Sequence, residues 1–413
     1  MQTQLAPEYQ HTPEGQAAEA ILRKCVHCGF CTATCPTYQL LGDELDGPRG
    51  RIYLIKQVLE GETPTEATQT HLDRCLTCRN CETTCPSGVQ YGRLIDIGRE
   101  VVERKVQRPL HQQAVRWLLK TGLTSPLFAP AMKLGQTVRG ALPKVLKDKV
   151  PAPQDAGSWP SRHHARKVIL LMGCVQPSMS PNINAATARV LDALGIEAVT
   201  PTQAGCCGAI RHHLSDAQGA LDDVRRNVDA WWPLLDQGLA EAVVVNASGC
   251  GVTVKEYGHL LRHDPEYADK ARRISELTRD LSEMLPDIVP ALSGKVEAAA
   301  RDLGTIAYHP PCTLQHGQQL RGGVEQHLGQ LGFDIRLSPV ESHLCCGSAG
   351  TYSVLQPEIS GQLRERKLGH LAALQPRAIV SANVGCITHL QSGTDTPVRH
   401  WVELLDQCLA QAT

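Results

Sequence analysis

Hydrophobic positions follow two different patterns along the chain. Before residue 107 they recur at helical spacing, as in the segments 52–61 and 94–105, which predict amphipathic helices. From residue 167 onward, short runs rich in β-branched residues alternate with helical stretches, and each run leads to a cysteine. The four runs are VILLMGC (168–174), AVVVNASGC (242–250), TIAYHPPC (305–312) and AIVSANVGC (378–386). Such runs are typical of buried parallel strands, so the pattern predicts a helical region followed by an α/β region.

The α/β region carries an internal repeat. GCCGA (205–209) matches LCCGSAG (344–350), and VVVNASGCG (243–251) matches IVSANVGCI (379–387). An internal duplication explains the match and predicts a duplicated α/β domain with pseudo-twofold symmetry. Four cysteines of the first half, Cys174, Cys206, Cys207 and Cys250, recur as Cys312, Cys345, Cys346 and Cys386 with offsets of 138, 139, 139 and 136. Ligands gather at the carboxyl ends of parallel strands, which is where this pattern puts the cysteines.

These patterns divide the chain into four parts. The Pro-rich, polar segment 151–160 marks a boundary before the α/β region. The expected parts are a helical domain (15–106), a connector (107–166), a first Cys-Cys-Gly repeat (167–300) and a second Cys-Cys-Gly repeat (301–408).

Composition narrows the function classes. The 413 residues carry a formal net charge of −1, and this balance argues against nucleic acid as a partner. The longest apolar run, 168–175, is far shorter than the roughly 20 residues of a membrane-spanning helix. The first residues show no basic-then-apolar signal, which predicts a cytoplasmic protein. In such a chain, 17 cysteines indicate metal ligands or redox thiols and not disulfides.

Two segments near the N-terminus carry the most specific motif. CVHCGFCTATCP (25–36) and CLTCRNCETTCP (75–86) both read Cys-x2-Cys-x2-Cys-x3-Cys-Pro. This is the run of two-cluster bacterial ferredoxins, in which the fourth cysteine ligates the other cluster. Four thiolates also suit zinc, but zinc modules usually pair two Cys-x2-Cys knuckles. The motif therefore predicts one [4Fe–4S] centre at Cys25, Cys28, Cys31 and Cys85, and a second at Cys75, Cys78, Cys81 and Cys35.

Other residues near the two motifs have ordinary interpretations. The insert 36–74 suggests an all-helical version of the two-cluster module. His27 and His71 lie near the ligands, and we expect both to be solvent-exposed residues and not ligands.

The repeated cysteines of the α/β region allow several roles. The pairs Cys206–Cys207 and Cys345–Cys346 are each followed by glycine, which permits a tight turn with positive φ. The thiols of each half could bind a further iron–sulfur cluster or zinc, act as a dithiol/disulfide pair, or be inert buried cysteines. His309 and His389 are candidate extra ligands, although hydrogen-bonded structural histidines are the expectation. Cys408, on a C-terminal helix, is expected in the core.

Several common catalytic motifs are missing from the sequence. No Gly-x-Gly-x-x-Gly follows a strand, no phosphate-binding Gly-x4-Gly-Lys loop occurs, and no catalytic triad or paired carboxylates stand out. Clusters without a hydride acceptor can carry single electrons, but a partner must break a C–H bond. The chain is therefore expected to be a subunit, with no catalytic residue of its own.

Tandem ferredoxin motifs followed by two Cys-Cys-Gly domains resemble the glycolate oxidase iron–sulfur subunit family. Relatives include subunits of anaerobic glycerol-3-phosphate dehydrogenase, lactate-utilisation proteins and heterodisulfide reductase. The resemblance covers about residues 15–405, and DGPRGRIYLI (46–55) adds support. It implies that FAD-binding partner subunits oxidise glycolate, or another 2-hydroxyacid such as D-lactate. This chain would then pass electrons towards quinone at the cytoplasmic face of the inner membrane.

One departure from the family pattern bears on the Cys-Cys-Gly sites. Heterodisulfide reductase relatives end each motif with Cys-x2-Cys, whereas Thr253 and His389 occupy those positions here. The fifth thiolate of a non-cubane cluster is therefore missing in both halves. A thiol–disulfide redox subunit, a glycerol-3-phosphate or lactate dehydrogenase subunit, and a scaffold with structural metal remain alternatives.

The connector concentrates positive charge. Between Arg99 and Lys149 there are eleven Lys or Arg residues and three acidic ones. They lie beside the apolar segments 117–120, 126–134 and 141–146. The segment is either a helical linker that covers the cluster domain or a docking surface for anionic lipid or an acidic partner subunit.

Overall fold

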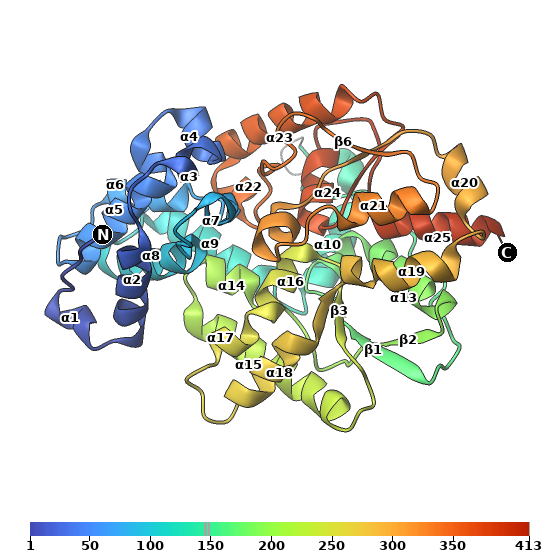
Figure 1. The fold of residues 1–413 in the computed structure, drawn as a ribbon, viewed down its shortest axis with the longest axis horizontal. Coiled ribbons are helices and arrows are strands. Elements are labelled where there is room, and N and C mark those ends of the chain that lie inside the picture. Colours follow the sequence, from blue (N-terminus) through green and yellow to red (C-terminus); the bar gives the residue numbers. More distant parts are fainter. Residues whose placement is uncertain (144–146, 148, 413) are drawn as a thin grey trace.

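The molecule consists of a helical domain at one end and two α/β repeats beside it. A computed structural model describes residues 1–143, 147 and 149–412. In Figure 1 the helical domain is blue, the first repeat green to yellow, and the second repeat orange to red. This arrangement confirms the predicted fold class.

The N-terminal domain is built from short helices around α8. Buried Leu94, Ile95, Val101 and Val102 form the inner face of α8 and pack against α2, α5 and α6. The predicted helices 52–61 and 94–105 correspond to α5 and α8, each starting slightly earlier. The elements are α1 (Pro7–Gln10), α2 (Pro13–Lys24), α3 (Phe30–Ala33), α4 (Pro36–Leu41), η1 (Glu44–Asp46), α5 (Pro48–Leu59), α6 (Glu66–Asp73), α7 (Asn80–Thr84) and α8 (Tyr91–Lys105).

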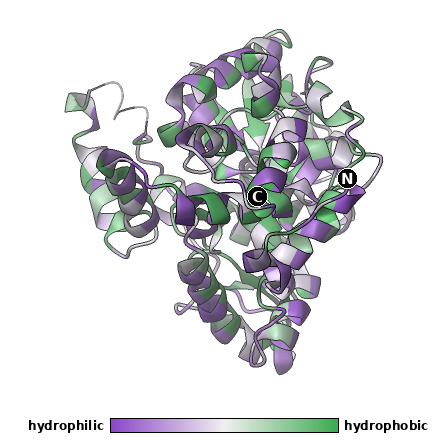
Figure 2. Ribbon diagram, turned by 90° about the vertical axis from the view of Figure 1, so that its left-hand side faces the viewer, coloured by the Kyte–Doolittle hydropathy of each residue, from purple (hydrophilic) through white to green (hydrophobic). Residues whose placement is uncertain are grey.

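The connector contains two further helices, α9 (Leu110–Gly122) and α10 (Phe128–Thr137), and a short η2 (Arg139–Ala141). Neither α9 nor α10 contains a buried residue. Residues 144–146, part of the last apolar segment named above, lie outside the described residues. Figure 2 shows helices that project from one side of the molecule.

Each repeat has one four-stranded parallel sheet. The strand orders are β2-β1-β3-β4 and β6-β5-β7-β8, so the two sheets have the same topology, as the duplication predicts. The strands are β1 (Arg166–Leu170), β2 (Ile196–Val199), β3 (Val243–Val245), β4 (Thr278–Asp280), β5 (Ile306–Tyr308), β6 (Ile335–Leu337), β7 (Ala378–Ser381) and β8 (Val398–His400).

Helices cover these sheets in both repeats. The first repeat has α12 (Gln176–Met179), α13 (Pro181–Ala193), α14 (Ala209–His213), α15 (Ala217–Asp236), α16 (Ser248–Lys255), α17 (Tyr257–Leu260), α18 (Ala268–Leu277), η3 (Leu281–Met284), α19 (Leu285–Leu292) and α20 (Glu297–Asp302). The second has η4 (Thr313–Gly317), α21 (Gly323–Gln330), α22 (Tyr352–Leu355), α23 (Pro357–Ala372), α24 (Val384–Gln391) and α25 (Trp401–Ala412). One hydrophobic cluster spans both repeats, and α13 packs against α25.

The strands are shorter than the apolar runs that predict them. In all four runs the strand ends several residues before the cysteine. Cys250 and Cys386 instead lie in the first turns of α16 and α24, while Cys174 and Cys312 lie in the connections after β1 and β5. In each sheet, the two cysteines therefore still follow the carboxyl ends of the two central strands.

The N-terminal domain contacts both repeats. The guanidinium of Arg79 makes two hydrogen bonds to the Glu256 carboxylate of the first repeat, at 2.6 and 3.0 Å. The Tyr352 hydroxyl of the second repeat donates to the backbone oxygen of Arg74 at 3.0 Å. These contacts join the second ferredoxin motif to both Cys-Cys-Gly domains. Among the described residues, no helix combines the length and apolar character needed to cross a membrane.

Candidate functional site: two thiol-lined cavities and two Cys-Cys-Gly turns

The first cavity of the N-terminal domain is lined by five cysteines from both ferredoxin motifs. Its wall also includes Pro48, Ile52 and Tyr91. Three of the cysteines belong to the first motif and two to the second. They are Cys25, Cys28 and Cys31, and Cys81 and Cys85.

The second cavity is lined by four cysteines, again from both motifs. Three thiols come from the second motif and one from the first, and they are Cys35, Cys75, Cys78 and Cys81. Cys81 also lines the first cavity, so the two cavities adjoin. The local backbone allows this: Gly29 and Arg79 both have left-handed φ values, of 85° and 57°, at the start of α3 and α7. These turns fold each cysteine loop around its cavity.

The thiols in both cavities fit a group that carries positive charge. Burial, together with the neighbouring thiols, raises the pKa of Cys31 to about 11. Burial also raises the pKa of Cys78 and Cys81 far above the ordinary thiol value, again with support from neighbouring thiols. A bound cation removes this penalty because it shares the charge of thiolates that would otherwise repel one another. The donor set therefore fits iron–sulfur clusters.

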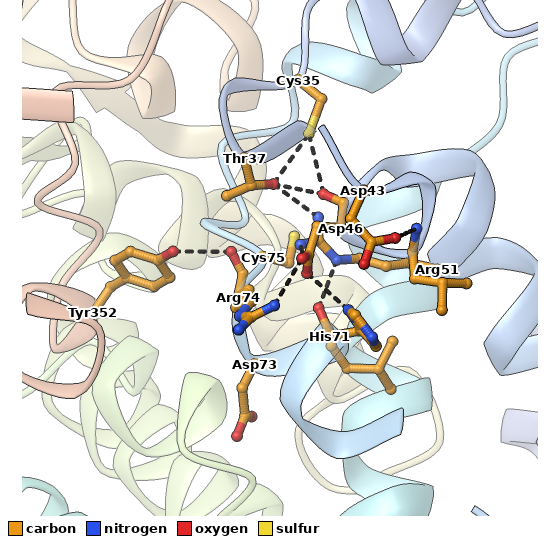
Figure 3. Close-up of polar contacts among 12 residues, drawn as sticks. Cys35, Thr37, Asp43, Asp46, Arg51, His71, Asp73, Arg74, Cys75 and Tyr352 are labelled. Carbon is orange, nitrogen blue, oxygen red and sulfur yellow. Dashed lines mark hydrogen bonds and ion pairs between the residues drawn. The ribbon is translucent and has the colours of Figure 1, made fainter. Parts of the chain in front are cut away.

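A buried ionic network lies behind the second cavity (Figure 3). Arg51, which lines the cavity, donates from Nη1 to the Thr37 hydroxyl at 3.1 Å and from Nε to the His71 backbone oxygen at 2.7 Å. The Thr37 hydroxyl lies 3.3 Å from the Cys35 sulfur. Arg51 also pairs with Asp46 at 3.5 Å. The positive charge of the Arg51 guanidinium therefore lies beside the thiols, in a region almost without solvent.

The same network explains the position of His71. The sequence suggests that His71 is solvent-exposed, and this is wrong: its ring lies 3.0 Å from the carboxylate of Asp46 and its side chain is largely buried. Asp43, Asp46 and His71 are close enough to hold a metal ion. However, Asp46 already pairs with Arg51 and Arg74, so its carboxylate is committed. His27 is exposed, as expected.

The first Cys-Cys-Gly turn brings together the four cysteines of the first repeat. The backbone N–H of Gly208 donates to the Cys206 sulfur at 3.4 Å. Hydrogen bonds from Cys174 and Cys207 lower the pKa of Cys206. Cys250 is in hydrogen-bond contact with Cys207, so the four thiols form one chain of contacts.

The second Cys-Cys-Gly turn repeats this arrangement with every thiol buried. The Cys312 thiol donates to Cys345 at 3.8 Å, and Cys346 is in hydrogen-bond contact with Cys345 and Cys386. The Gly347 N–H donates to the Cys345 sulfur at 3.4 Å. The duplication seen in the sequence is therefore also a duplication of thiol geometry.

The second repeat also adjoins the second ferredoxin cavity. Buried Leu76, Cys312 and Cys345 form one cluster with Tyr352, and Cys78 packs against it. The sequence could not reveal this contact, because the residues are more than 200 positions apart. It places a thiol of the N-terminal domain against the thiols of the second Cys-Cys-Gly turn.

The two candidate histidines differ sharply. His389 fits the expected structural role, since its Nε2 lies 3.2 Å from both the hydroxyl and the backbone oxygen of Ser360. His309 does not: it is 1% exposed, and neither ring nitrogen has a hydrogen-bond partner. The expectation of a hydrogen-bonded His309 is therefore wrong. Cys408 is completely buried, as expected.

Comparison with known proteins agrees with this architecture. A 4Fe-4S dicluster domain matches residues 21–89, and the cysteine-rich domain family matches residues 168–255 and 306–391. The chain is thus an iron–sulfur protein with a domain for two [4Fe–4S] clusters and two cysteine-rich domains.

The full-length relatives define the family. The chain is 53% identical to the glycolate oxidase iron-sulfur subunit of Escherichia coli over 99% of both chains. It is 29% identical to the probable glycolate oxidase iron-sulfur subunit of Bacillus subtilis, over 91% of this chain and 90% of that protein. Lactate utilization protein A of Geobacillus thermodenitrificans is 29% identical and covers 58% of this chain and 98% of its own length. The chain belongs to the glycolate oxidase iron–sulfur subunit family.

Gly347 is required by the second Cys-Cys-Gly turn. Its φ is +92°, and an added Cβ would lie 2.5 Å from the backbone oxygen of Ser360. Gly347→Ala should lower the free energy of unfolding by at least about 2 kcal/mol, because a strained backbone costs of order 1–3 kcal/mol and the methyl group adds overpacking. Gly350→Ala, with φ +63° and nothing within 4 Å, is the matched control. Equal denaturation midpoints for the two variants would contradict the close approach.

Arg51 should raise the reduction potential of the second cluster only. Removing a buried positive charge beside Cys35 and Cys75 makes an added electron less stable. Arg51→Met should therefore lower one of the two potentials by on the order of 60 mV, equivalent to about a tenfold change in a one-electron equilibrium. Redox titration followed by electron paramagnetic resonance (EPR) measures this shift. Arg49→Met is the control, because Arg49 lines the first cavity and is half-exposed. An equal shift of the second cluster's potential in both variants would contradict a selective effect of Arg51.

Proposed function

We propose that this chain is the electron-transfer subunit of a flavin-dependent glycolate dehydrogenase complex. It receives single electrons from FAD on partner subunits and passes them towards quinone. The observation that carries the proposal is the unbroken row of thiols: Cys81 lines both cavities, and Cys78 packs against Cys312 and Cys345. The name of the 53% identical relative supports glycolate as the substrate of the complex.

In this proposal the two ferredoxin motifs ligate crosswise. Cys25, Cys28, Cys31 and Cys85 hold one [4Fe–4S] cluster, and Cys75, Cys78, Cys81 and Cys35 hold the other. Each cluster supplies a one-electron redox centre when bound. The protein's own contribution is to keep the sulfurs in place, exclude water and set the potentials through groups such as Arg51 and Tyr91, whose hydroxyl donates to Cys75 at 3.7 Å.

The Cys-Cys-Gly sites would add a further metal or redox centre. The second one is the better placed for electron transfer, because a ferredoxin thiol packs against its cysteines. The glycolate assignment is favoured over a lactate-utilisation role because the likeness to lactate utilization protein A covers 58% of this chain. A thiol–disulfide reductase or glycerol-3-phosphate dehydrogenase role has no comparable observation in its favour.

The function is tested by anaerobic co-expression with candidate flavoprotein subunits. The purified complex should reduce a soluble quinone analogue with glycolate as donor, and D-lactate serves as the competing 2-hydroxyacid. Omission of this chain should abolish quinone reduction while leaving reduction of a flavin-reactive dye. Equal quinone reduction without this chain would refute the electron-transfer role.

Crosswise ligation makes an asymmetric prediction for cysteine variants. Cys85→Ser should lose the first centre, although Cys85 belongs to the second motif, whereas Cys81→Ser should lose the second. Cys28→Ser should lose the first centre and disturb the other, because Cys35 and Cys85 connect the two motifs. Iron content and EPR spectra measure these losses, and Cys408→Ala, a thiol buried in a distant core, is the control. An intact, unshifted second cluster in Cys28→Ser, together with an intact first cluster in Cys78→Ser, would exclude close crosswise ligation.

The connector presents an apolar surface that supports docking of a partner subunit. The side chains of Leu110, Trp117 and Leu118 on α9 are 82%, 60% and 62% exposed, and Leu127 and Leu134 are 74% and 67% exposed. Apolar patches of this kind mark interaction sites. The 53% identical relative is itself named as a subunit, which gives such a surface an occupant.

The basic residues of the connector favour a protein partner over lipid. Arg108 and Arg116 both pair with Asp73, at 2.6 and 3.0 Å, and Lys120 lies 3.6 Å from Asp216. Charges used inside the molecule contribute little attraction to an anionic membrane. In this proposal the chain is cytoplasmic, and the complex reaches quinone at the cytoplasmic face of the inner membrane.

The apolar surface can be tested by exposed substitutions. Trp117→Gln with Leu118→Gln should reduce recovery of partner subunits at both low and high salt, because burial of apolar area is insensitive to screening. Leu239→Gln, at a surface leucine of the first repeat that is 53% exposed, is the control. Unchanged partner recovery would contradict the proposal. Loss of binding to anionic vesicles with unchanged partner recovery, especially in Lys133→Gln with Arg139→Gln, would identify the surface as a membrane contact instead.

A further inference from the structure

The unpartnered imidazole of His309 needs an explanation. His309 directly follows β5, and its backbone N–H donates to the Val380 oxygen at 2.8 Å, which fixes the residue at the carboxyl edge of the sheet. Its ring is buried, and both nitrogens lack a partner. The great majority of buried polar side-chain atoms have a hydrogen-bond partner, so an exception indicates an ordered water, a bound ion or a functional role.

Two thiols converge on this ring. One ring nitrogen of His309 and the sulfurs of Cys346 and Cys386 all lie within 4.8 Å of one another. Metal–sulfur bonds of about 2.3 Å and metal–nitrogen bonds of about 2.0 Å place two donors to one ion at most roughly 4.6 Å apart. The spacing is therefore close to that of ligands around a single ion, and three separate segments of the second repeat supply it.

We propose that His309, Cys346 and Cys386 bind one thiophilic divalent cation, zinc or iron, with Cys345 as the neighbouring fourth donor. This proposal deepens the proposed function and rests on its assignment of a metal centre to the second Cys-Cys-Gly turn. It adds a nitrogen ligand and a single ion, in place of four equivalent thiolates around a cluster.

The charge balance of the site fits this ion. A divalent cation with two thiolates and a neutral imidazole has no net charge, and a third thiolate from Cys345 makes the site anionic. Lys367 is 3% exposed and its positive charge acts on both Cys345 and Cys346. Its ammonium is anchored by donation to the Glu341 backbone oxygen at 2.5 Å. The buried lysine therefore offsets the remaining negative charge.

The first repeat cannot form the same site. The offset of 138 residues that relates Cys312 to Cys174 places Leu171 where His309 stands in the second repeat, and Leu171 is buried in the apolar core. The two halves therefore diverge in metal chemistry despite their common topology. The nitrogen-containing site is also the one that lies beside Cys78 of the second ferredoxin cavity.

The test uses the full chain purified anaerobically, with iron, zinc and acid-labile sulfide measured together. Wild-type protein should contain one zinc or iron per chain beyond the iron that sulfide accounts for. His309→Leu, which installs the residue of the first repeat, should weaken binding of added Zn²⁺ by more than about 100-fold. Loss of a residue that only supports a ligand already weakens metal binding by up to about 100-fold, and loss of a ligand should weaken it more. The EPR signals of the two ferredoxin clusters should remain.

Matched variants keep the result interpretable. His389→Leu removes a buried but hydrogen-bonded histidine nearby and should retain the ion, whereas Cys386→Ser should lose it as His309→Leu does. In protein loaded with Co²⁺, pulsed EPR should show nitrogen coupling that disappears in His309→Leu. Equal Zn²⁺ affinity in wild type and His309→Leu would overturn the proposal. Extra iron accompanied by equal sulfide would also overturn it, because it would indicate a cluster; in both cases the intact ferredoxin signals leave the proposed function standing.

Discussion

Buried thiols crowded around one another cannot all be ionised unless a cation lies among them. This constraint governs the whole chain, because sixteen of its cysteines are gathered into four groups and only Cys408 packs as an ordinary core residue. Burial and neighbouring thiols raise the pKa of Cys31, Cys78 and Cys81. The 4Fe-4S dicluster domain therefore holds its thiols together at a cost in stability that bound metal offsets.

The relative placement of the domains arranges three of these thiol groups next to one another: the first ferredoxin cavity, the second cavity and the second Cys-Cys-Gly turn. The crosswise contribution of Cys35 and Cys85 makes the two ferredoxin cavities neighbours. Docking through Arg74 and Tyr352 then sets Cys78 against the second repeat. The first repeat touches the same domain through Glu256 and Arg79, but two of its thiols, Cys207 and Cys250, belong to a separate apolar cluster. Two repeats with one topology thus acquire different positions relative to the two ferredoxin cavities.

Much of this arrangement was predictable from the sequence, because periodic signals are local. The spacing within 25–36 and 75–86 indicates the two thiol groups, and the repeated Cys-Cys-Gly motifs indicate the duplicated sheets. The edge strands β2, β4, β6 and β8 are short and carry little pattern. The sequence does not indicate that His71 is buried, because tertiary packing brings its partner Asp46 to it. Likewise, the lack of a hydrogen-bond partner for the His309 ring depends on the tertiary packing of segments that are distant in the sequence.

We propose that electrons leave the flavin through this chain and do not bypass it. Rapid freeze-quench EPR of the assembled complex, mixed with glycolate without any acceptor, distinguishes the two routes. If electrons pass through this chain, both [4Fe–4S] clusters become reduced within a single turnover, and their spectra show magnetic interaction between adjoining centres. Flavin reduction and glycolate oxidation with both clusters remaining oxidised would contradict it.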